Sequence, residues 1–159
     1  MTASKKRVRY QEGDWFLVPL RDGGTALGLA ARTSKTGVTL GYFFQLPEGD
    51  LPAATSNLQP AAAVLVRLFG DLNIINGQWR VVARAGGWPR ERWPLPRFGR
   101  VDERAGRAWI VEYADDDPNR TLCETPCSQD AARQLPRDGV SGAGAIEVVL
   151  TRLLGSKCT

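Results

Sequence analysis

Two segments that resemble β-strands constrain the fold of this chain more than any other feature. The first is residues 11–20, followed by a Gly/Asp turn at 21–24, and the second is residues 64–71, which continues to 75–82. Each segment carries a large aromatic residue and borders a turn signal, a combination that is typical of strands. Together they predict the frame of a small, curved antiparallel sheet.

The remaining strands are predicted from runs of β-branched, aromatic and alternating apolar residues. Asp22-Gly23-Gly24 predicts a hairpin turn, and Gly28 and Ala30 predict a bend or close packing in the strand that follows. Pro and Gly predict loops at 47–60 and 86–98. We expect short helical turns near Leu58 and at residues 71–76. The predicted strands are residues 15–20, 26–33, 38–46, 62–69, 78–85 and 107–113.

Helices longer than a single turn are predicted only near the C-terminus. Ser128 is a favourable N-cap for a helix over residues 129–135. Residues 141–154 carry one apolar helical stripe that stops at Gly155, and the stripe consists of Ile146, Val149, Leu150 and Leu153. Because the predicted strands come first along the chain and the helices last, we predict an α+β fold. It would consist of a curved antiparallel sheet or partial barrel of about six strands with one or two C-terminal helices.

The chain of 159 residues is long enough for one domain with a hydrophobic core. We expect a disordered basic leader over residues 1–10 and a single α+β domain over 11–159. The basic start is not followed by an apolar segment, which argues against a secretory signal. No apolar run approaches the roughly 18 residues of a membrane helix. A cytoplasmic location without membrane contact is therefore expected.

The chain contains no histidine, which excludes the usual Ser-His-Asp, Cys-His and His-metal mechanisms. We expect no enzymatic activity, no metal and no other cofactor. A zinc site built on Cys123, Cys127 and Cys158 would need a carboxylate as its fourth ligand, which is unusual for structural zinc. Free thiols are the expected state in a cytosolic protein. Cys123 and Cys127 could pair only if their Cα atoms came within about 7 Å.

Two further motifs are better explained by structure than by chemistry. Asp115-Asp116-Asp117 precedes a proline in a predicted turn, where solvated acids are expected rather than a catalytic pair. The glycine-rich residues 139–144 precede a helix as phosphate loops do, but they contain no Lys followed by Ser or Thr. We expect a flexible entry to the last helix there.

The segment 86–98 is the strongest candidate for a contact surface. Tryptophan and arginine are enriched at binding hot spots, and proline makes such a surface rigid. The candidate residues for partner binding are Trp88, Arg90, Arg92 and Trp93. In the alternative, both tryptophans fold back as a lid over the sheet and both arginines are solvated. A surface for single-stranded nucleic acid is a third reading, weakened by nearby acids at Glu91, Asp102 and Glu103.

Residues 12–20, with the strand around Gly28, resemble the opening of the bacterial immunity protein 26 family. The strand 66–70, the sequence from Gly77 to Val82 and the proline-rich stretch after it resemble the same family. The resemblance covers roughly residues 10–115 and does not include Cys123 to Thr159. It implies a small, cytosolic, non-enzymatic protein, encoded beside the toxin that it neutralises in a polymorphic toxin system. It implies no catalytic residues.

The resemblance therefore implies tight stoichiometric binding to a cognate toxin domain. The formal net charge of +4 would suit an acidic toxin surface and speed the encounter. The alternative is a small barrel-like module without catalytic activity that binds nucleic acid or another protein, a function that salt-dependent binding to oligonucleotides would reveal. The toxin, the binding face and the oligomeric state are left open.

Overall fold

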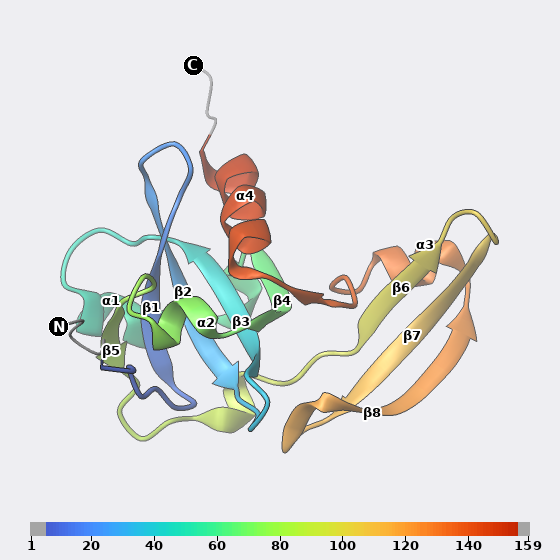
Figure 1. Ribbon diagram of the computed structural model, residues 1–159, viewed down its shortest axis with the longest axis horizontal. Coiled ribbons are helices and arrows are strands. Elements are labelled where there is room, and N and C mark those ends of the chain that lie inside the picture. The colour runs from blue at the N-terminus through green and yellow to red at the C-terminus, as the bar shows by residue number, and fades with distance from the viewer. Residues whose placement is uncertain (1–5, 156–159) are drawn as a thin grey trace, which may run out of the picture.

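The computed structural model describes residues 6–155, which form two β-sheets and four α-helices. We call the six-stranded sheet and the helices α1, α2 and α4 the body, and the three-stranded sheet with α3 the arm (Figure 1). The arm extends sideways from the body. The predicted α+β class and the open, curved sheet are confirmed. The second sheet was not predicted.

The strands of the body lie in the order β5-β1-β2-β3-β4-β9. Neighbours are antiparallel except β4 and β9, which run parallel. The two segments that constrain the fold meet here, because β1 pairs with β5 and places Trp15 opposite Ala83. The strands are β1 (Asp14–Pro19), β2 (Thr25–Arg32), β3 (Val38–Gln45), β4 (Leu65–Gly70), β5 (Val81–Arg84) and β9 (Val140–Ser141).

Both faces of this sheet are buried, and β2 and β3 are therefore apolar along nearly their whole length. One face carries Trp15, Leu29 and Tyr42 beneath the segment after β5. The other carries Phe16, Phe43, Phe69 and Trp79. The predicted close packing at Gly28 is confirmed, because a Cβ atom there would lie 2.4 Å from the Phe16 ring.

The second face is covered by the helices α2 (Leu72–Ile75) and α4 (Ala143–Leu154). The predicted C-terminal helix and its stop at Gly155 are confirmed. Ile146 and Leu150 are fully buried against the sheet, whereas Leu153 is 52% exposed. The buried stripe is therefore narrower than the sequence pattern, because a single sheet face contacts only part of the helix circumference.

The arm consists of β6 (Phe98–Asp102), β7 (Arg107–Ala114), β8 (Asp117–Cys127) and α3 (Gln129–Arg133). Only β7 and α3, with its Ser128 cap, were predicted. Residues 119–126 of β8 are all exposed, so this strand has no alternating apolar pattern to recognise. Phe98, expected at the end of a loop, is the first residue of β6.

The fifth predicted strand, over residues 78–85, was too long. The strand β5 spans Val81–Arg84, and its pairing with β1 shifts register between Trp15 and Phe16. Trp79 and Val81 consequently pack on one face of the sheet and Ala83 on the other. This register shift interrupts the regular strand that was predicted over residues 78–85.

The expected leader falls partly outside the described residues, which exclude 1–5 and 156–159. Within the described part, the Val8 N–H donates to the Ile75 carbonyl over 2.8 Å. The Tyr10 hydroxyl donates to Asp71 over 2.6 Å. Burial, and then this hydrogen bond, raise the pKa of Tyr10 well above its ordinary value. The disordered leader and the single domain stay predictions.

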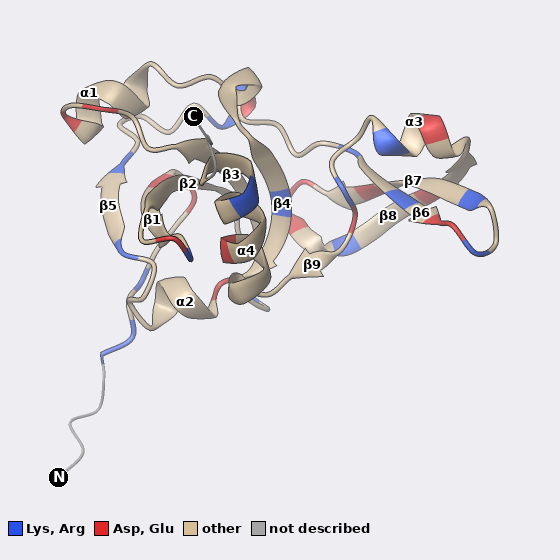
Figure 2. Cartoon of the chain, turned by 90° about the horizontal axis from the view of Figure 1, so that it is seen from above, with Lys and Arg blue, Asp and Glu red and all other residues tan. Residues whose placement is uncertain are grey.

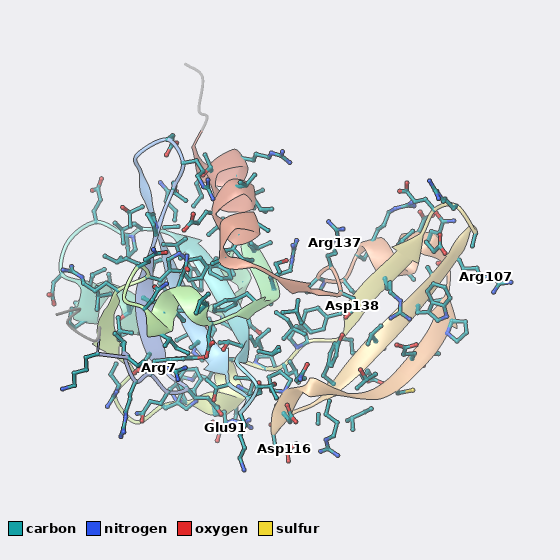
Figure 3. The ribbon with its side chains drawn as sticks, viewed as in Figure 1. Arg7, Glu91, Arg107, Asp116, Arg137 and Asp138 are labelled. Carbon is teal, nitrogen blue, oxygen red and sulfur yellow. The ribbon has the colours of Figure 1, made fainter. Side chains whose placement is uncertain are left out.

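The arm joins the body at its base. Phe98 is fully buried in the first core layer and lies edge-on to Tyr113 at 5.6 Å between ring centroids. The Tyr113 hydroxyl donates to Asp138, which also lies 3.6 Å from the Arg100 guanidinium. Figure 3 shows Asp138 on the segment before β9, where this segment meets the base of the arm, with Arg137 pointing outward. A small apolar contact and a charged cluster therefore position the arm.

Candidate functional site

Residues 86–97, which we call the lid loop, connect β5 to β6 across the first face of the body sheet. Its prolines at 89, 94 and 96 cannot donate hydrogen bonds to a sheet ladder, which favours a loop. The one regular turn is the 3-10 helix η2 (Arg90–Arg92), closed by the Trp93 N–H, which donates to the Arg90 carbonyl over 3.1 Å. The predicted structured loop is confirmed up to Arg97.

Trp93 is part of the core, with 4% of its surface exposed. Its ring lies edge-on to Trp15 and Tyr42 at centroid distances of 5.9 and 5.1 Å. The Tyr42 hydroxyl donates to the Pro94 carbonyl and fixes the loop from below. Burial raises the pKa of Tyr42 to about 12, so this donor stays protonated at neutral pH. The placement agrees with the lid alternative for Trp93, and its role in partner binding stays a prediction.

Trp88 and Arg90 lie together on the N-terminal side of the lid loop. The Trp88 ring lies against Gly13, where a Cβ atom would meet it at 3.1 Å. Both the Trp88 indole N–H, over 3.4 Å, and the Arg90 Nε, over 2.7 Å, donate to Glu12. Arg90 also pairs with Asp115 of the arm. Arg90 therefore links the N-terminal segment, the lid loop and the arm.

Asp115 is the second half of this link. It accepts from the buried Arg32 over 2.9 Å as well as from Arg90. Burial alone would raise the pKa of Asp115, but the hydrogen bonds from both arginines outweigh it and hold the pKa below its ordinary value. We expected solvated turn acids here. Asp116 and Asp117 fit that expectation, since within the described part of the chain their side chains bond only to Arg120 and to the Asn119 N–H.

Arg92 and Trp93 line a pocket of about 390 Å³ between the lid loop and the helix α1 (Leu51–Ser56), which we call the lid pocket. Pro52, Leu58, Pro60 and Pro89 contribute its apolar surface, and Trp15 and Trp93, both buried, lie beneath it. Among the residues that the structure describes, two arginines and no carboxylate line it. The lining residues are Trp15, Pro52, Thr55, Ser56, Leu58, Gln59, Pro60, Arg84, Ala85, Gly86, Pro89, Arg92 and Trp93.

The two arginines of the lid pocket differ in their partners. The Arg84 Nε donates over 2.8 Å to Asp14, which is fully buried, while 60% of the Arg84 side chain is exposed. The hydrogen bond and the charge of Asp14 raise the pKa of Arg84 further. Arg92 is exposed and forms no ion pair within the described part of the chain. Its charge is therefore available to a ligand. Figure 2 shows basic residues at both ends of the adjacent strand β5.

The polar groups of the lid pocket are suited to recognition. The hydroxyl groups of Thr55 and Ser56 both donate to carbonyl groups of α1, so neither is paired with a base that could activate it as a nucleophile. Within residues 6–155, no group of three or more His, Cys, Asp and Glu is arranged to hold a metal ion. The arrangement offers an apolar floor with guanidinium donors at the rim.

The other sequence motifs lie away from this pocket. Residues 139–144 form β9 and the start of α4, with Gly142 as the N-cap, as expected for a helix entry. Cys123 and Cys127 are both free and lie four residues apart in β8. Their Cα atoms are therefore about 13 Å apart, beyond the reach of a disulfide. Cys158 lies outside the described residues.

Sequence reasoning thus found only the part of the pocket that the lid loop contributes. It placed Arg92 and Trp93 on one surface segment, but it missed Arg84, Pro52 and Gln59, which other elements contribute. It also missed Asp115 as a partner of Arg90. The sequence carries no local signal for these contacts, because the residues concerned lie on different elements that only the fold brings together. No helix among the described residues has the length and hydrophobicity needed to cross a membrane.

Comparison with protein families gives one match. The family model described as Immunity protein 26 matches residues 11–110, which is more than half of the chain. Every residue that lines the lid pocket falls inside this range, whereas β8, α3, β9 and α4 lie entirely beyond it. Searches of curated proteins and of solved structures found no match.

Proposed function

Since this chain belongs to the Immunity protein 26 family, we propose that it neutralises a cognate toxin domain by tight, stoichiometric binding and without catalysis. The observation that carries the proposal is the lid pocket, which lies inside the family-matched region. It combines aromatic residues, rigid prolines and an arginine that has no ion-pair partner among residues 6–155. Large aromatic residues and arginine dominate the binding energy of protein interfaces.

Within this proposal, the four candidate residues have different roles. Arg92 contacts the toxin directly, because its side chain is exposed at the pocket rim. Trp93 forms the floor and holds the pocket open from the core side. Trp88 and Arg90 border the contact surface and fix the lid loop to Glu12. A preorganised loop loses little conformational entropy on binding, which favours tight association.

The test is co-expression with the C-terminal domain of the protein encoded by the adjacent reading frame. We expect that domain to arrest growth when expressed alone, and this chain to restore growth. The two proteins should co-purify, and calorimetric titration should give a fixed stoichiometry. If the domain is toxic but this chain neither protects the cells nor binds the domain, the proposal is wrong.

The same experiment separates inhibition by binding from an enzymatic mechanism. Stoichiometric inhibition requires at least one immunity protein for each toxin molecule, so protection should be lost when the toxin is in excess. Protection at substoichiometric amounts would contradict a non-catalytic role. Steeply salt-dependent binding to oligonucleotides, in the absence of any toxin complex, would instead favour the nucleic-acid alternative.

A further inference from the structure

We propose that the lid pocket receives a toxin segment in which a carboxylate lies beside a large apolar side chain. The inference rests on the proposed function and names the chemistry of the partner at that site. It follows from the shape of the pocket, from its charge and from the way its walls are held.

The floor and walls specify the apolar half of this ligand. Trp15 and Trp93 are 2% and 4% exposed, so they are held by the core and cannot swing away. Pro52, Pro60 and Pro89 form rigid walls around them. A volume of about 390 Å³ is at the small end of the range for ligand sites. It suits a side chain with its neighbour better than a whole folded element.

The rim specifies the acidic half. Among the described residues, the charged ones that line the pocket are Arg84 and Arg92, so its charge is entirely positive. The charge of Arg84 is balanced by its ion pair with Asp14, whereas Arg92 has no acidic partner among the described residues. A planar guanidinium pairs well with a carboxylate through two parallel hydrogen bonds. One uncompensated arginine therefore fits one carboxylate next to the buried apolar group.

A peptide segment fits this charge distribution better than a nucleic acid does. A nucleic-acid strand presents a phosphate at every nucleotide and is bound by grooves with several basic residues. Here the exposed Arg92 follows Glu91, and Arg90 is already paired with Glu12 and Asp115. Positive and negative side chains therefore lie close together around the lid loop. A single carboxylate satisfies Arg92 without placing further negative charges near these acids.

The test measures affinity for the toxin domain, using the wild-type complex as reference. Arg92→Glu should weaken binding at least about tenfold, because it places two carboxylates together. Ser56→Trp should weaken binding by a similar factor, because Ser56 is exposed at the pocket and an indole would fill it. The matched control is Arg152→Glu on α4, an exposed position outside the pocket with the same change of charge. This control should change the affinity less than about twofold.

The acidic partner group can then be found by genetic complementation. Single Asp or Glu residues of the toxin are replaced with Arg, and each variant is tested against wild-type and Arg92→Glu protein. One toxin variant should be neutralised better by Arg92→Glu than by the wild type, which would identify the carboxylate.

The outcomes separate the two proposals. If wild-type protein binds and neutralises the toxin, but Arg92→Glu and Ser56→Trp do so equally well, the pocket inference is wrong and the immunity function stands. If the wild type forms no complex, the proposed function itself fails. Binding of a single-stranded oligonucleotide that Arg92→Glu abolishes would overturn the inference in favour of a nucleic-acid ligand. Unchanged melting temperatures of both variants would show that they remain folded.

Discussion

In the body, large apolar side chains are buried on both faces of a six-stranded sheet, whereas in the arm the strand β8 is exposed along most of its length. The body core contains a stacked pair, Trp79 on Phe16, at 5.6 Å between ring centroids. The buried apolar residues of the arm are Phe98 and a few small ones, namely Ala108, Val111, Ala114, Pro118 and Ala132. Apolar burial therefore stabilises the body far more than the arm.

Charged contacts replace part of the missing core at the base of the arm. Arg100 lies 2.9 Å from Glu124 and 3.6 Å from Asp138, and Asp115 pairs with Arg32 and Arg90. Partly exposed ion pairs contribute little and are weakened by salt. From this difference we expect that the arm can unfold locally while the body stays folded. We expect the arm to exchange its amide hydrogens before the body does.

The largest expected effect tests the core of the body. Trp79→Ala should lower the free energy of unfolding by about 3–5 kcal/mol, because it leaves a cavity beneath α4 and removes the stacking on Phe16. Urea unfolding followed by circular dichroism measures this change. The matched control in the arm is Trp109→Ala, whose ring is only partly buried. An equal loss in both variants would contradict the difference between body and arm.

Leu150→Ala should cost about 2–5 kcal/mol, because Leu150 is fully buried between α4 and the sheet. Leu153→Ala in the same helix is the control, since that side chain is 52% exposed. It should leave the free energy of unfolding nearly unchanged. If Leu150→Ala also had no effect, α4 would contribute little to the stability of the body.

A smaller effect is expected from the link between arm and body. Asp115→Asn removes the charged partner of the buried Arg32 and of Arg90 and should cost about 1–3 kcal/mol. Hydrogen exchange should increase in β7 and β8 more than in β1 to β3. Asp116→Asn is the control, because its side chain is 81% exposed. Faster exchange throughout the body as well would show that the two sheets unfold as one unit.

The smallest effect concerns Tyr113→Phe, which removes the hydrogen bond to Asp138 and should cost about 0.5–1.5 kcal/mol. Burial, and then this hydrogen bond, raise the pKa of Tyr113 above its ordinary value. The unfolded chain therefore loses this proton at a lower pH than the folded chain does. The contribution of protonated Tyr113 to the free energy of unfolding is therefore complete below about pH 10. It is lost as the pH rises further.

Chemical denaturation across this alkaline range measures the contribution. The wild type should lose more stability above pH 10 than Tyr113→Phe does. An identical pH dependence for the two proteins would mean that Tyr113 does not contribute to the alkaline loss. Tyr42→Phe provides a comparison from the body, since the pKa of Tyr42 is raised to about 12 by burial.

Local patterns in the sequence were sufficient to predict most of the body. Runs of apolar, aromatic and β-branched residues between turn signals predicted β1 to β4, and the Ser128 cap and the Gly155 stop predicted the helices that they border. The resemblance to the immunity protein 26 family, noted on residues 10–115, agrees with the family match over 11–110. These features could be read because each depends on neighbouring residues.

Only the tertiary structure decided how the lid loop is used. The composition of residues 86–98 allowed both a lid and a contact surface, and folding divides the two roles between adjacent residues, with Trp93 buried and Arg92 exposed. It also brings Arg84 and α1 beside them and places Asp115 against Arg90. The sequence determined the strands β1 to β5 and β7, because apolar patterns and turn signals are local. Charge pairing and pocket shape depend on contacts between distant segments, so they were decided only when the chain folded.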